Sequence, residues 1–247
     1  GNSNTAVGYQ TLLNNSTGSD NIAIGKSSLK TNTIGARNVA IGTETLQSPQ
    51  QYNDNTAIGY LAISSSQGNK NTAVGSNALR GSYSNLTEQG NSAIGYYALN
   101  QCYGTMSTAI GFETLKYSSA EGNTAIGAKA LSGVTFGTTG TGLVAVGYKS
   151  MMANTNASYG TAIGNESMFS NTSGANNTAL GFQSLYGNSL GSSNIAIGYQ
   201  AGYSETGSNK LYIENSNSTT PLIYGEFDNN LARINGNFRV NSTTIAG

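Results

Sequence analysis

Apolar residues recur at fixed positions of a short repeat along most of the chain. The phrase Asn-Thr-Ala-Val-Gly at 4–8 returns in similar form eleven times. Two residues before each of its glycines stands Ala, and one residue before stands Val, Ile or Leu. Leu, Ile or Met follows four residues after the Gly in eleven of the twelve copies. The repeat glycines, as we call them below, are Gly8, Gly25, Gly42, Gly59, Gly75, Gly95, Gly111, Gly127, Gly147, Gly164, Gly181 and Gly198. Such regularity identifies each copy as one structural unit.

The spacing of the copies predicts a β-solenoid. Helix pairs and propeller blades need roughly 33–50 residues per unit, whereas successive repeat glycines are 16 to 20 residues apart. This period suits a coil of two short strands and two turns. One strand precedes the Gly, and the second ends on the following Leu, as in Thr11-Leu12 and Ala78-Leu79. We therefore expect an all-β fold, a parallel β-solenoid of about twelve coils of 16–20 residues, stacked at about 4.8 Å per coil.

Alternation along the first strand predicts which residues share a face. Successive strand side chains point to opposite sides, so the Ala row (Ala6 to Ala196) and the Val/Ile/Leu row beside it should face opposite ways. We expect the branched residues to fill the interior together with the Leu row. The Ala row should then form a surface that another backbone approaches closely.

A row of Thr residues shares the face of the branched residues. Thr stands three residues before the repeat Gly in seven copies, at Thr5, Thr56, Thr72, Thr108, Thr124, Thr161 and Thr178. A flat Thr row is typical of ice-binding surfaces. Four β-branched apolar residues interrupt it, at Ile22, Val39, Val144 and Ile195. We therefore favour half-buried β-branched packing over ice binding.

The repeat ends near residue 205, which predicts two parts. Residues 1–205 form the repeat β-roll, and residues 206–247, with denser apolar residues and no repeat, form a C-terminal β cap or junction. Two long coils should bulge at loop tips near 82–89 and 134–141, and irregular loops on a rigid scaffold are common binding sites.

Charge and composition exclude several classes of function. Eleven basic residues balance eleven acidic ones, which leaves no electrostatic footprint for nucleic acid or an anionic membrane. No apolar run reaches the roughly 18 residues of a membrane span, so we expect no membrane insertion. Without His, and with Cys102 as the one Cys, we expect no metal and no cofactor, and Cys102 is interpreted as a small buried or half-buried filler. Because residue 1 falls inside a repeat, we interpret the sequence as a piece of a longer chain.

The carboxylates do not form a catalytic pattern. Two residues after repeat glycines stand Glu113 and Glu166, as does Glu44 in an earlier coil, and Lys129 and Lys149 share this position. We interpret them as a solvated charge ladder, with Glu113 beside Lys129 and Lys149 beside Glu166. A glycosidase needs two carboxyl groups about 5–10 Å apart across one groove. The closest carboxylate cluster in the sequence consists of Glu214, Glu226 and Asp228. We expect ordinary surface roles for it, no catalytic residues and no enzymatic activity.

Aromatic residues are the candidate binding residues. They follow the repeat Gly directly at Tyr9, Tyr60, Tyr96, Phe112, Tyr148, Phe182 and Tyr199. Rows of exposed rings can stack on sugars, or they can cover the seam between chains, since Tyr has an apolar body and a polar tip. We favour packing between chains, and sugar binding remains the alternative.

The repeats resemble those of two families of fibrous proteins. NIAIG (21–25 and 194–198) and NSAIG (91–95) resemble the heads of trimeric autotransporter adhesins, the YadA-like β-roll. The longer phrases at 4–12 and 55–63 are similar to repeats of bacteriophage tail-fibre-like proteins, in which a stretch like 209–236 often precedes a chaperone domain. The resemblance implies a left-handed β-roll, three chains wound side by side, and a role in attachment.

These observations lead to a functional expectation. We expect a structural or attachment segment of an extracellular trimeric fibre or adhesin, on a cell surface or a phage virion. Its partners would be itself, as a homotrimer, and a surface glycan or host receptor. A thin coil supports self-association, because a few buried side chains at ~1.5–3 kcal/mol each hardly offset ordering sixteen residues at ~1–2 kcal/mol each. The alternative function is a tail-spike-type glycan-processing enzyme.

Overall fold

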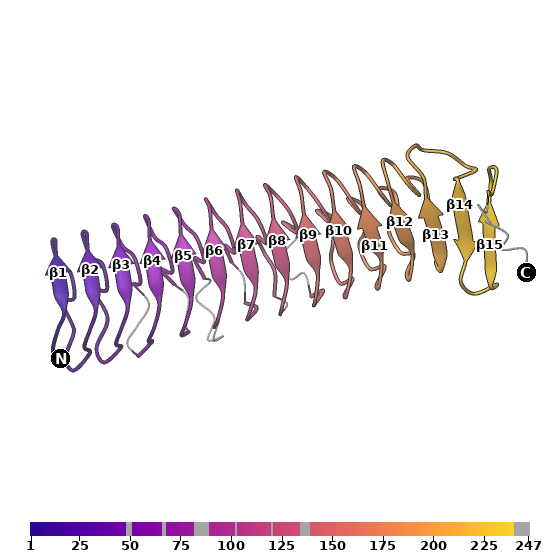
Figure 1. The fold of residues 1–247 in the computed structure, drawn as a ribbon. Coiled ribbons are helices and arrows are strands. Elements are labelled where there is room, and N and C mark those ends of the chain that lie inside the picture. The colour runs from indigo at the N-terminus through magenta and orange to yellow at the C-terminus, as the bar shows by residue number, and fades with distance from the viewer. Residues whose placement is uncertain are drawn as a thin grey trace, which may run out of the picture.

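The chain forms a long rod with its two termini at opposite ends (Figure 1). The computed structural model describes residues 1–47, 51–65, 68–81, 89–101, 103–119, 121–133 and 139–239. One sheet of fifteen strands in chain order builds a parallel β-solenoid of about 11 turns. The described residues contain no helix. The predicted fold class is therefore confirmed.

Twelve three-residue strands carry the repeat, and each ends one residue before a repeat glycine. They are β1 (Thr5–Val7), β2 (Ile22–Ile24), β3 (Val39–Ile41), β4 (Thr56–Ile58), β5 (Thr72–Val74), β6 (Ser92–Ile94), β7 (Thr108–Ile110), β8 (Thr124–Ile126), β9 (Val144–Val146), β10 (Thr161–Ile163), β11 (Thr178–Leu180) and β12 (Ile195–Ile197). Each pairs in parallel with the next in a register that places Ala opposite Ala, as Ala6 lies opposite Ala23. A coil is thus one rung of a continuous ladder.

The sheet continues past the last repeat. Strand β13 (Lys210–Ile213) pairs in parallel with β12, and then β14 (Ile223–Glu226) and β15 (Leu231–Ile234) add to the edge as an antiparallel pair. The loop between β13 and β14 projects away from the stacked coils and rejoins the sheet at the C-terminal end of the rod (Figure 1). The residues after 206 therefore extend the same sheet, in which only β14 runs opposite to the strands of the coils.

The interior of the roll is the opposite of the one predicted. Ala and its branched neighbour do face opposite ways, but Ala points inward: the Ala residues of β2 to β12 are fully buried. The branched residues point outward, and Val7, Ile24 and seven equivalents are 37–57% exposed. Each coil is so narrow that only a methyl group fits beneath the strand once Leu enters from the other side. The prediction that Val and Ile fill the roll was wrong.

The second predicted strand is a turn. After Gly111 (φ 138°), the backbone is left-handed again at Glu113 (φ 51°) and Leu115 (φ 50°), and the same alternation recurs in the other coils. It turns the buried Leu115 side chain into the core. Neighbouring coils bind this turn on both sides, since Glu113 N donates to Tyr96 O at 2.9 Å and Leu115 N donates to Ala130 O at 3.0 Å. These bonds hold a conformation that costs about 1–2 kcal/mol for each non-glycine residue.

A ladder of buried Asn side chains runs through the core, and sequence analysis assigned it no role. Asn38, four residues before its repeat glycine, receives the backbone N–H of Asn55 on its Oδ1 at 3.0 Å. Its own backbone N–H donates to Asn21 Oδ1 at 3.0 Å, and its Nδ2 donates to Tyr52 O at 2.8 Å. The amide thereby satisfies backbone groups that would otherwise be buried without partners.

Candidate interaction surface

One side of the rod is formed by the strand side chains that point away from the core. It comprises the positions three residues and one residue before each repeat glycine, together with the aromatic residues directly after it. We call this surface the outer sheet face. Because every coil repeats at the same register, its side chains form three straight rows along the rod. The rows are mostly Thr, then Ile or Val, then Tyr or Phe.

The Thr row lies on this face, as its alternation predicted, but not against the interior. Thr5 and Thr178 are exposed, and the five Thr residues between them are partly exposed. The branched residues that share the face point away from the core. Five of the seven Thr residues are thus half-buried as expected, but they do not pack against the interior of the roll.

All seven candidate aromatic residues lie on the outer sheet face and are 38–68% exposed. Two pairs on neighbouring coils stack. The Tyr96 and Phe112 ring centroids are 5.5 Å apart at an angle of 15°, and those of Phe182 and Tyr199 are 5.3 Å apart at 11°. Lys149 Nζ lies 5.0 Å from the centroid of the Tyr148 ring. The rings thus form short stacked groups that remain open to solvent.

A second aromatic row escaped sequence analysis. Phe169, Tyr186 and Tyr203 lie five residues after the last three repeat glycines. Their rings stack almost in parallel, with centroids 5.1 Å and then 4.9 Å apart. The sequence signal for this row is weak, because an aromatic residue recurs at this position in only three coils. A polar ladder lies nearby in the chain: Gln183 Nε2 donates to Glu166 Oε2 and Gln200 Nε2 donates to Gln183 Oε1, both at 2.8 Å.

The predicted charge ladder is confirmed at one place only. Glu113 binds Lys129 at 3.8 Å, as expected, and binds Lys116 more closely at 2.9 Å. The predicted pair of Lys149 and Glu166 does not form among the described residues, because Lys149 lies over an aromatic ring and Glu166 binds Gln183. Because these side chains remain partly open to solvent, each ion pair contributes about 1 kcal/mol or less to stability.

The acidic residues near the C-terminus have separate partners. Glu214 accepts backbone N–H groups of Asn215 and Leu222 at 2.6 and 2.8 Å, and these bonds hold its pKa below the ordinary value. Glu226 accepts the Tyr224 hydroxyl at 2.7 Å and lies 3.6 Å from Lys210 Nζ. Hydrogen bonding to Tyr224 lowers the pKa of Glu226. Both carboxylates are therefore held in the charged form by groups of the cap itself.

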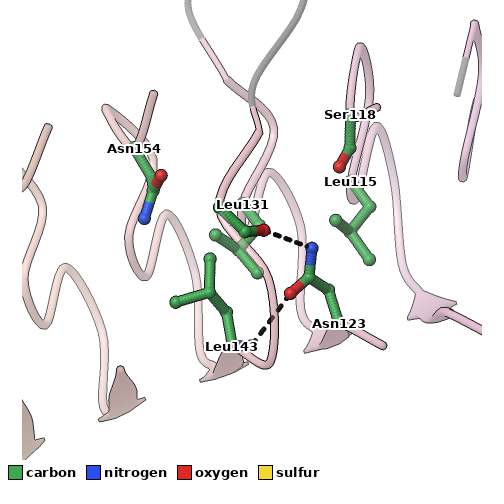
Figure 2. Close-up of a pocket in the computed structure, with 7 residues that line it drawn as sticks. Leu115, Ser118, Asn123, Leu131, Leu143 and Asn154 are labelled. Carbon is green, nitrogen blue, oxygen red and sulfur yellow. Dashed lines mark hydrogen bonds between the residues drawn. The ribbon is translucent and has the colours of Figure 1, made fainter. Parts of the chain in front are cut away.

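An interior cavity of about 10 Å³ marks a break in the Asn ladder (Figure 2). Leu143 occupies the ladder position there, and only its backbone N–H binds Asn123 Oδ1, at 2.9 Å. The Oδ1 atom of Asn154, which lines the cavity, is buried without a hydrogen-bond partner. A space of this size holds about one water molecule. It is a packing irregularity and not a ligand site.

Three further expectations concern metal ions, membrane insertion and the loop tips. Among the described residues, no group of three or more His, Cys, Asp or Glu side chains could hold a metal ion. The same residues contain no helix long and apolar enough to cross a membrane. Residues 82–88 and 134–138 of the predicted loop tips, and Cys102, lie outside the described residues. Comparison of the chain with models of protein families, with curated proteins and with solved structures finds no match.

Proposed function

We propose that this chain is an attachment and spacer segment of an extracellular trimeric fibre, in which three copies pack through the outer sheet face. The observation that carries the proposal is the outward row of Ile, Val and Leu on twelve successive coils, which is exposed in nine of them and partly exposed in the other three. A folded protein seldom leaves so regular an apolar row open to water. The three-chain arrangement and the extracellular setting rest on the resemblance of the repeats to adhesin heads and tail fibres.

The size of the outer sheet face fits an interface. Twelve coils at ~4.8 Å and four residue steps at ~3.3 Å give a surface of about 55 by 13 Å, on the order of 700 Å². The largest apolar patch of a typical monomer is about 300–600 Å², and a standard interface covers about 800 Å² on each partner. The face is therefore large enough for a stable contact, although the Thr row makes it less apolar than a core.

The periodicity of the face favours a second copy as its partner. Side chains that recur at every coil interdigitate best with a surface of the same spacing, and another copy of this chain has that spacing. The formal net charge is zero, so copies do not repel one another strongly. The aromatic row borders the branched row and would cover the seam.

Replacing Ile110 and Ile126 by Lys should turn the trimer into a monomer. These neighbours on β7 and β8 both point outward, so the change leaves the core of each chain intact. Two unpaired charges buried between copies should weaken association at least a hundredfold. Sedimentation would measure the change, since the parent should have about three times the 25.4 kDa mass of one chain.

Leu190→Lys is the matched control. Leu190 is also strongly exposed, but it lies in a turn and not on the outer sheet face. This variant should sediment like the parent, and circular dichroism should be the same for all three proteins. A parent that sediments as a folded monomer, or a double variant that stays trimeric, would contradict the proposal.

A further inference from the structure

A pocket of about 310 Å³ lies where the last coil meets the C-terminal strands. Its lining consists of Gly202, Tyr203, Ser204, Glu205, Tyr212, Asn217, Ser218 and Thr219. Residues 202–205 belong to the turn of the last coil, and residues 217–219 belong to the loop between β13 and β14 that returns to the end of the rod (Figure 1). Its size is at the small end of the range of ligand pockets, about 300–1,000 Å³.

The aromatic stack ends at this pocket. Tyr186 covers one side of the Tyr203 ring, with centroids 4.9 Å apart and ring planes only 3° from parallel. The pocket is lined by Tyr203, by its neighbour Gly202 and by residues that follow, but not by Tyr186. Its other lining residues come from the last turn, β13 and the loop beyond them, and so from the side on which the next member of the stack would lie. A flat ligand with an apolar face can occupy that position.

A rigidly held carboxylate forms another wall. Glu205 Oε1 accepts the backbone N–H groups of Thr206 and Gly207 at 2.9 and 2.6 Å, and its Oε2 accepts the hydroxyl of Tyr212. Burial, and then this hydrogen bond, raise the pKa of Tyr212, so the phenol remains a donor. A carboxylate has about four acceptor sites, and three are in use. One site on Oε2 is left for a donor in the pocket.

The chemistry of these walls defines a ligand. We propose that this pocket binds the neutral pyranose ring of a glycan, with the ring stacked on Tyr203 and one of its hydroxyl groups donating to Glu205. Asn217, Ser218 and Thr219 add an amide and two hydroxyl groups at the rim, which can bind further sugar hydroxyls. No lining residue is cationic, so Glu205 disfavours anionic sugars. The inference rests on the proposed attachment function, for which it names the ligand class.

Calorimetric titration of the full chain tests this inference. The probes are the methyl glycosides of glucose, galactose, mannose and N-acetylglucosamine, with a sialic acid glycoside as the anionic comparison. At least one neutral glycoside should bind, and the sialic acid should bind at least tenfold more weakly. Tyr203→Ala and Glu205→Gln should each lower the affinity about tenfold or more, because stacking or a charge-assisted hydrogen bond is lost.

Two further variants keep the test independent of folding. Asn217→Ala changes only an exposed rim residue and should weaken binding severalfold without affecting the fold. Tyr159→Ala removes a more exposed aromatic residue in an earlier coil and should leave the affinity unchanged. Failure of all four neutral glycosides to bind, or binding that survives both Tyr203→Ala and Glu205→Gln, would overturn the inference.

Sedimentation of the same samples separates this inference from the proposed function. A trimer that binds none of the glycosides keeps the fibre proposal and rejects the sugar site. A monomer that binds a neutral glycoside through Tyr203 and Glu205 supports the site and rejects the trimeric fibre.

Discussion

Replacing Gly111 by Ala is expected to lower the free energy of unfolding by about 3–5 kcal/mol. Gly111 has a φ of +138°, and a Cβ built on it would lie 2.8 Å from both the carbonyl carbon and the oxygen of Gly127 on the next coil. Gly127 cannot retreat easily, because its backbone N–H donates to Ile110 O at 2.8 Å. The clash is therefore between two hydrogen-bonded backbones. Denaturant unfolding followed by circular dichroism would measure the loss.

Gly122→Ala provides the matched control. Gly122 also has a positive φ, +66°, but nothing lies within 4 Å of its added Cβ. Only the left-handed backbone opposes Ala here, so the expected loss is about 1–2 kcal/mol. The difference between the two variants measures the contact between coils together with the greater backbone strain at a φ of +138°. Equal losses in the two variants would mean that backbone conformation alone, and not close stacking, requires the repeat glycine.

The second large effect concerns the Asn ladder. Asn55→Ala is expected to lower the free energy of unfolding by about 2–4 kcal/mol, because buried groups lose their partners. The backbone N–H of Asn71 would lose its acceptor at 2.9 Å, and Gly68 O would lose its donor at 3.0 Å. Asn38 Oδ1 would also lose the donor at 3.2 Å that Asn55 Nδ2 supplies. Besides unfolding, hydrogen exchange should show faster exchange of the Asn71 amide.

Asn165→Ala is the comparison for this change. Asn165 directly follows a repeat glycine and is exposed, so its removal should change the stability by no more than about 0.5 kcal/mol. Similar losses at Asn55 and Asn165 would show that the buried amides contribute little. The natural break at Leu143, beside the small cavity, shows that a coil can form without one ladder amide.

The repeat was sufficient to predict the coils, because identical short phrases at a nearly constant spacing stack best in register. The pairing of Ala6 with Ala23, and of every later Ala with the next, follows directly from that spacing. Alternation also predicted that Ala and its branched neighbour face opposite ways. It could not show which face is inside, since that depends on the width of the coil.

The width of the coil is set by its turn, and the turn is not visible in the residue types. Lys129 and Leu131 adopt left-handed backbone, with φ of 59° and 48°, although neither residue favours it. Hydrogen bonds from both neighbouring coils stabilise this conformation. It draws Leu131 inward and leaves room only for Ala beneath the strand, so Ile126 is turned to the outside.

The two aromatic surfaces also show what the repeat pattern can predict and what it cannot. The row that begins at Tyr9 was found because its position recurs beside the repeat glycine in many coils. The pocket of Tyr203, Glu205 and Tyr212 was missed, because its walls come from the last turn, β13 and a loop that folds back over them. A periodic sequence pattern determines which segments stack on neighbouring copies of the same repeat. Where the repeat stops, the arrangement depends on contacts between segments that share no pattern, and only three-dimensional packing brings those together.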